Sequence, residues 1–261
     1  MNFYQGRIII YKEKMQTVII SDQHGWLPDL PSGDLLLIAG DCCPLGKYDP
    51  GFQNDWFRNE FANWLHRQSF TYKVGICGNH EFIGENQEGD DILRCLDWHY
   101  LQGEAVEIQG ITIWGDPHSP GSRRWAFMDE DTTLEKHYSK IPDYVDILIT
   151  HGPPYGTGDQ VVSGQRVGSK SLQKHLPRIR PSLHTYGHIH EAREVHQIQK
   201  AEWSSVSLNA SLLDHRFQPW GKCWQLNLEY SDAGWRVDPK SIKEPNLDTT
   251  DFPEMPTGKS E

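Results

Sequence analysis

Five short apolar segments of this chain each run into a small residue and then into a side chain that can bind a metal ion. The segments are 18–20, 35–39, 74–77, 147–150 and 183–186. The polar residues that follow them are, in order, Asp22 with His24, Asp41, Asn79 with His80, His151, and His188 with His190. Strands of an open α/β sheet end at a common carboxyl edge, where binding sites form. We therefore predict one site at this edge, with two divalent metal ions that activate water to attack a phosphoester.

Composition and charge restrict the partners. The chain has 261 residues, of which 37% are hydrophobic and 23% charged, as in a globular domain. A formal net charge of −11 argues against binding to a nucleic-acid polymer. A small phosphoester substrate stays open, because two metal ions would reverse the local field. No segment approaches the roughly 18–20 apolar residues of a membrane helix, and the first residues do not resemble a signal peptide. We expect no membrane partner, and the pattern does not indicate an oligomeric state.

The five cysteines, at positions 42, 43, 77, 95 and 223, form no C-x-x-C pair. An odd number without a framework spacing is typical of reduced thiols in a cytoplasmic protein. Cys42 directly follows Asp41, so a thiolate ligand is an alternative to a site of Asp, His and Asn alone. We expect the second arrangement, because that ligand set is complete without Cys42.

The chain divides into three predicted parts. Residues 1–14 form an N-terminal extension, 15–237 a single domain, and 238–261 a C-terminal tail that contains several prolines. Met15 stands immediately before the first predicted strand, so we expect a chain that begins at Met15 to keep its activity. The β-branched run at 7–11 suggests, alternatively, that the extension adds an edge strand.

Four helices are expected between and after the early strands, at 53–69, 88–98, 132–140 and 169–177. The apolar residues of 53–69 recur with helical spacing, and this segment lies where a βαβ crossover is needed. Thr132 or Thr133 is expected to cap the third helix. Ser169 is the expected N-cap of the fourth helix and Pro177 its stop.

Short apolar runs after residue 190 suit a second, mostly antiparallel sheet. The expected fold class is therefore α/β, with two mixed β-sheets packed as a sandwich and flanked by helices.

Taken singly, the candidate site residues have ordinary structural explanations. Asp41 could cap a helix, and His151 could be a buried core histidine. Asp22 and His24 are two residues apart, and on an extended segment both would point to the same side. His188 and His190 repeat this spacing. Five such motifs in one order leave little room for coincidence, and Asp, His and Asn together suit Mn, Fe, Zn or Co.

The motif order D-x-H, G-D, G-N-H-E, H-G-P-P and G-H-x-H resembles the calcineurin-like metallophosphoesterase superfamily. Further segments resemble the metallophosphoesterase-domain-containing proteins, which are relatives of the class III cyclic-nucleotide phosphodiesterases. These segments are 78–81, 150–154, 166–168, 180–184, 187–191 and 209–211.

The resemblance implies a role for each residue. One metal would be held by Asp22, His24 and His190, the other by Asn79, His151 and His188, with Asp41 bridging the two. His80 would act as general acid or as transition-state stabiliser. A hydroxide held between the ions would attack phosphorus. Some mammalian relatives have Gly in place of His188, so its presence here predicts a full two-metal site.

The residues that follow the G-D motif differ from those of the protein phosphatases in this superfamily, and this difference restricts the expected substrate. Protein phosphatases continue the G-D motif with Asp-Arg-Gly, whereas Asp41 is followed here by Cys42 and Cys43. The expected activity is therefore hydrolysis of small phosphodiesters, cyclic nucleotides among them. The alternatives are a phosphomonoesterase or nucleotidase, and a weakly active binding or scaffold protein. Outside the motifs, we expect His118 to be a surface residue, with substrate contact as the alternative.

Overall fold

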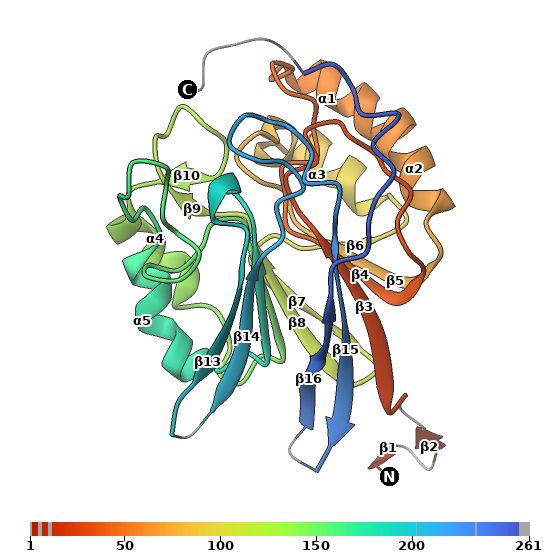
Figure 1. Ribbon diagram of the computed structural model, residues 1–261, viewed down its shortest axis with the longest axis vertical. Coiled ribbons are helices and arrows are strands. Elements are labelled where there is room, and N and C mark those ends of the chain that lie inside the picture. The colour runs from red at the N-terminus through yellow and green to blue at the C-terminus, as the bar shows by residue number, and fades with distance from the viewer. Residues whose placement is uncertain (1, 5–6, 10–11, 202, 233, 256–261) are drawn as a thin grey trace.

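The computed structural model describes residues 2–4, 7–9, 12–201, 203–232 and 234–255. Two six-stranded sheets lie face to face in it, and helices cover their outer surfaces (Figure 1). This is the α/β sandwich expected from the sequence. Parts of the predicted extension and tail, at 1, 5–6, 10–11 and 256–261, lie outside the described residues.

The first sheet has the strand order β16-β15-β3-β4-β5-β6. Its strands are β3 (Lys14–Ile20), β4 (Gly33–Ile38), β5 (Phe70–Gly75), β6 (His99–Tyr100), β15 (Trp224–Ser231) and β16 (Gly234–Lys243). β3 to β6 run parallel, and β15 is antiparallel to both β3 and β16. The parallel strands therefore share one carboxyl edge.

The second sheet has the order β13-β14-β12-β11-β8-β7. Its strands are β7 (Glu104–Ile108), β8 (Ile111–Asp116), β11 (Ile147–Thr150), β12 (Leu183–Tyr186), β13 (Val195–Gln199) and β14 (Ser204–Asn209). β8, β11, β12 and β14 are parallel, with antiparallel strands at both edges. The predicted antiparallel sheet after residue 190 is wrong. β13 and β14 extend the second sheet, while β15 and β16 return to the first.

The remaining elements are short. The helices are α1 (Pro50–Trp56), the π-helical turn η1 (Phe57–Phe61), α2 (Ala62–Arg67), η2 (Phe82–Glu85), α3 (Gln87–Arg94), α4 (Asp131–Tyr138), α5 (Lys170–Ile179) and η3 (His190–Ala192). Two small strand pairs are β1 (Asn2–Tyr4) with β2 (Arg7–Ile9), and β9 (Ser119–Pro120) with β10 (Met128–Asp129). Among the described residues, no helix has the length and apolar character needed to cross a membrane.

Three apolar layers hold the sandwich together. Because side chains alternate along a strand, Ile19 and Leu37 face the second sheet and pack with Ile149 between the sheets. Val18 points to the other side, into the layer beneath α1, α2 and α3. Leu148 lies in the third layer, beneath α4 and α5. Burial on both faces explains why these strands appear in the sequence as continuous apolar runs.

The predicted helix ends are partly correct. Ser169 caps α5, since its hydroxyl oxygen accepts from the Leu172 N–H at 2.8 Å. Pro177 does not stop this helix, because it lies in the last turn and the chain ends the helix at Arg180 with φ 52°. The expected Thr cap of α4 is wrong, because the helix begins at Asp131.

Regular structure extends past the expected tail boundary at residue 238. β16 continues through Lys243, and its pairs with β15 place Asn227 opposite Asp238 and Gln225 opposite Lys243. Beyond the strand, Leu247 is buried in the layer beneath α1 to α3. Packing of this kind cannot be seen in a segment whose composition is mostly polar.

Candidate metal centre

The five predicted strand ends meet in space, but they come from two sheets. β3, β4 and β5 of the first sheet lead to Asp22, Asp41 and Asn79, and β11 and β12 of the second lead to His151 and His188. The sequence predicted the edge of a single sheet. The residues gather instead where the carboxyl edges of both sheets adjoin, and most of them are buried there.

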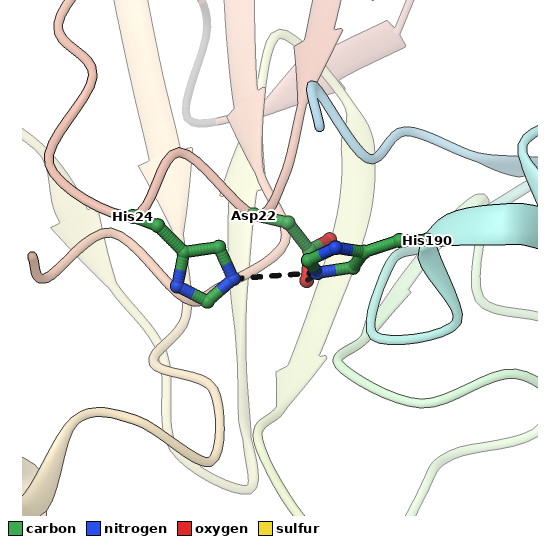
Figure 2. A group of neighbouring side chains, drawn as sticks. All are labelled: Asp22, His24 and His190. Carbon is green, nitrogen blue, oxygen red and sulfur yellow. Dashed lines mark hydrogen bonds and ion pairs between the residues drawn. The ribbon is translucent and has the colours of Figure 1, made fainter. Parts of the chain in front are cut away.

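One half of the site consists of Asp22, His24 and His190 (Figure 2). The two histidine Nε2 atoms face each other at 3.3 Å, and His190 Nε2 lies 3.1 Å from Asp22 Oδ1. Hydrogen bonds to residues outside this group fix the positions of His190 and Asp22. His190 Nδ1–H donates to the carbonyl of Asp214 at 3.1 Å, and the Ser211 hydroxyl donates to Asp22 Oδ2 at 2.8 Å. The free Nε2 lone pair of His190 is therefore directed into the site.

The other half consists of Asn79, His151 and His188. His151 Nδ1–H donates to the Ala39 carbonyl at 2.9 Å. Its Nε2 faces two further acceptors, Asn79 Oδ1 at 2.9 Å and Asp41 Oδ2 at 3.3 Å. His188 completes the group, with its ring centroid 5.0 Å from that of His151.

Asp41 lies between the two halves. Its Oδ2 is 3.3 Å from His151 Nε2, 3.8 Å from His24 Nε2 and 3.8 Å from His80 Nε2. Burial would raise the pKa of this carboxyl, but the charges of His151 and His80 hold it well below its usual range. A fully ionised carboxylate in this position can reach a cation in either half.

The residues present fit metal ions. In the first half, two histidine nitrogens and a carboxylate oxygen converge. In the second half, a single histidine nitrogen faces two oxygens. Lone pairs brought together in this way repel unless a cation lies among them. Burial opposes a positive charge on His151, yet Asp41 raises its pKa to about 9. The site therefore attracts positive charge strongly.

The backbone at the site is strained. Asp22, His24, Asp41 and His188 have φ values of 54°, 45°, 53° and 66°, in the left-handed region that L-residues seldom adopt. The expected extended geometry of the D-x-H and H-x-H motifs is therefore wrong. His188 and His190 serve different halves because the left-handed turn separates their side chains. Such strain persists where the surrounding structure holds it, often at functional sites.

Two glycines make room for the ligands. A Cβ atom at Gly187 would overlap the Asp22 carboxylate, and one at Gly78 would overlap that of Asp41. The glycines that precede Asn79 and His188 in the sequence pattern thus have a steric reason. They allow neighbouring strand ends to approach one another closely.

His80 lies beside the metal centre. Its backbone N–H donates to Asp41 Oδ1 at 2.9 Å, and its ring packs against Trp125 and Tyr48 at centroid distances of 4.6 and 5.5 Å. Burial lowers the pKa of the His80 ring. Tyr48 lies between β4 and α1, and Trp125 lies between β9 and β10. No motif in the sequence marked them.

Glu81 is a supporting residue of the site. Its carboxylate accepts from the backbone N–H groups of Asp41, Cys43 and Gly78, at 2.8, 2.9 and 2.6 Å. It thereby ties the loop after β4 to the loop after β5. Burial, and after it Glu81, raises the pKa of the Cys42 thiol well above its usual value. Cys42 belongs to none of the groups of converging metal ligands among the described residues.

The expected surface position of His118 is wrong. Its side chain is half-buried, and Nδ1 lies 2.7 Å from Oδ1 of the buried Asp116.

Carboxylate, imidazole and amide groups gathered in the two halves of this site are typical ligands of a metal-dependent hydrolase. The family model "Calcineurin-like phosphoesterase" matches residues 15–192. The chain therefore belongs to the calcineurin-like phosphoesterase family. Its match ends just after His190, so all of the candidate ligands lie within it.

Individual relatives agree with this assignment. Human metallophosphoesterase domain-containing protein 1 is 32% identical over 231 residues, an alignment that covers 77% of this chain and 67% of the human protein. The UPF0046 protein T07D4.2 of Caenorhabditis elegans is 33% identical and covers 69% of this chain, with 52% of its own length aligned. The solved structure of TT1561 from Thermus thermophilus shares the fold, with a TM-score of 0.58 at 13% identity, over 89% of this chain and 98% of that one.

Proposed function

We propose that this protein is a phosphodiesterase that uses two divalent metal ions to hydrolyse small phosphodiesters, cyclic nucleotides among them. The observation that carries the proposal is the position of Asp41. One buried, ionised carboxylate faces ligand nitrogens of both halves, His24 on one side and His151 on the other. A bridging carboxylate of this kind belongs to a site for two ions.

The residues would divide the work as follows. Asp22, His24 and His190 would hold one ion, Asn79, His151 and His188 the other, with Asp41 shared. When bound, the ions would neutralise charge on the phosphoryl oxygens and lower the pKa of a water molecule. His80 would stand over the leaving oxygen and donate a proton or a hydrogen bond to it. Its backbone bond to Asp41 and its contact with Trp125 would keep the ring in place.

The neighbours of His80 support a diester substrate. The rings of Tyr48 and Trp125 lie against it, and they lie 5.1 Å from each other. Aromatic faces suit an apolar or planar group on the leaving side of an ester. The charge of −11 supports a small substrate rather than a nucleic-acid polymer. We also infer that the protein acts in the cytoplasm, since its five cysteines are free thiols.

The test uses the full-length protein stripped with a chelator and then given manganese. We expect hydrolysis of bis-p-nitrophenyl phosphate to return with the metal, at a higher rate than that of p-nitrophenyl phosphate. His80→Ala should lower turnover by about 10²–10⁴-fold without changing metal content, because it removes a proton donor rather than a ligand. His66→Ala, at an exposed histidine, is the matched control.

Each other outcome has a clear meaning. Faster hydrolysis of the monoester would replace the proposal with a phosphomonoesterase or nucleotidase. Normal metal content without turnover on either ester, with any divalent metal, would overturn the enzymatic role and favour a binding or scaffold protein.

A further inference from the structure

A second group of metal-ligand side chains lies outside the centre described above. It consists of Asp116 at the end of β8, His118 two residues later, and His137 in the last turn of α4. One ligand atom from each lies within 4.8 Å of the other two. None of the three belongs to the motifs of the metal centre.

Asp116 is the buried member, with 1% of its surface exposed. Its Oδ1 accepts from the backbone N–H of His118 at 2.9 Å and faces that ring's Nδ1 at 2.7 Å. Its Oδ2 is buried and has no hydrogen-bond partner among the residues that the structure describes. The nearest nitrogen of His137 is 3.9 Å away, beyond hydrogen-bond reach. A buried carboxylate oxygen without a partner is costly unless a cation compensates it.

Two histidine rings stand beside the Asp116 carboxylate. Their rings lie against each other with centroids 3.7 Å apart, tilted by 32°. Two imidazolium rings would repel at this distance. Burial, and after it the neighbouring His118, lowers the pKa of His137, which keeps that ring neutral and its lone pair available.

We propose that Asp116, His118 and His137 bind a third divalent transition-metal ion of the zinc type, separate from the two ions of the phosphoesterase centre. His118 Nδ1 lies 2.7 Å from Asp116 Oδ1 and His137 Nδ1 lies 3.9 Å from Asp116 Oδ2, so the two histidines face different oxygens of one carboxylate. Ligands of one ion bound at about 2.0–2.2 Å stand at most about 4.4 Å apart. Small side-chain adjustments bring the three atoms around one ion. The ion compensates Asp116 Oδ2 and replaces the hydrogen bond between Asp116 and His118.

The ion would connect α4 to the loop that leads to the phosphoesterase centre. His118 begins this loop, and its backbone carbonyl accepts from the Tyr138 hydroxyl at 3.0 Å. Seven residues later the same loop supplies Trp125, which packs on His80. A bound cation would hold the start of the loop from two sides, through β8 and through α4.

The experiment counts zinc in the full-length protein after chelation, reloading with zinc and desalting. His137→Ala should bind one zinc fewer per chain than the parent, and the zinc-induced rise in Tm should be smaller. His175→Ala is the matched control, since that histidine also contacts α4, through Glu135, but lies outside the group. Equal zinc content in the parent and His137→Ala would overturn the proposal.

An Asp41→Ala background separates this site from the phosphoesterase centre. Adding His137→Ala to that variant should lower its zinc content by one further ion per chain. Crystals of the parent soaked in zinc provide a measurement that needs no variant. An anomalous peak among Asp116, His118 and His137 supports the site, whereas peaks confined to the phosphoesterase centre show that the three residues form only an ion-pair cluster.

Discussion

Two buried histidines on adjacent strands of the second sheet behave in opposite ways. His151 follows β11, and His184 lies within β12. Both are buried, with 0% and 1% of their surface exposed. Burial lowers the pKa of His184 to about 3, whereas the pKa of His151 is raised to about 9 because Asp41 outweighs the same effect of burial. Desolvation alone keeps a histidine neutral, and a carboxylate beside it reverses the outcome.

Hydrogen bonding explains how the neutral form of His184 is fixed. The Thr150 hydroxyl donates its one proton to the Gly152 carbonyl at 2.8 Å, so it can only accept from His184 Nε2–H at 2.9 Å. The other ring nitrogen is buried and has no partner in the described part of the chain. His184 is thus a structural histidine, while His151 lies beside the Asp41 carboxylate, which stabilises a positive charge on it.

Removal of Asp41 should have the largest effect, because it removes the carboxylate that distinguishes His151 from His184. In Asp41→Ala the ligands of both halves lose the carboxylate that they share, so metal content should fall. Diesterase turnover should drop by more than the roughly 10–100-fold that loss of a ligand's hydrogen-bond partner costs. Elemental analysis and a kinetic assay on one sample measure both effects. Asp146→Asn, at a partly buried carboxyl whose bond is to the Thr112 N–H, should retain metal and activity. If Asp41→Ala held as many ions per chain as the parent, Asp41 would not be the bridge.

A change at Gly187 tests the close approach of the strand ends. In Gly187→Ala the new methyl group overlaps the Asp22 carboxylate and the Ser21 hydroxyl, so the ligand must move. We expect activity to fall roughly 10–100-fold, as for other losses of ligand positioning, with weaker metal binding in a titration. Gly51→Ala, at the exposed start of α1, is the control. Unchanged metal affinity in Gly187→Ala would mean that the site has more room than the structure shows.

A smaller effect should appear in the pH dependence of stability, through His184. Its pKa is 6.5 when unfolded and about 3 when folded, so between these values only the unfolded chain binds the proton. Its contribution to stability is complete above pH 6.5 and decreases by up to about 1.4 kcal/mol per pH unit as the pH falls towards 3. His184→Gln keeps a donor to Thr150 but cannot titrate. The free energy of unfolding of His184→Gln, measured with denaturant from about pH 7 to about pH 4, should therefore decrease less steeply than that of the parent or of His66→Gln. Parallel curves would show that His184 titrates normally in the fold.

The sequence predicted the candidate ligands because their signal is local. An apolar run that stops at a small residue and a polar one marks the end of a buried strand, and several such ends in order indicate a common site. Ser169 was recognisable as a helix cap for the same reason. The partner strand of β15 and β16 could not be predicted, because either sheet offered an edge to a short apolar run. The start of α4 was missed because its N-cap, Glu130, makes no side-chain capping bond. Asp131 in the first turn contacts α5 instead, where its carboxylate accepts from the backbone N–H of Ser171 at 3.0 Å.

The amino-acid sequence by itself determined the α/β class, the family motifs and the residue types at the strand ends, since these depend on spacing along the chain. The tertiary structure alone decided that the ends come from two sheets, that left-handed turns aim the ligands, and that Trp125 and Tyr48 lie against His80. It also decided that Asp116, His118 and His137 meet. These features depend on contacts between segments far apart in the chain. Burial and neighbouring charge, which set the protonation of each histidine, exist only once those segments have packed.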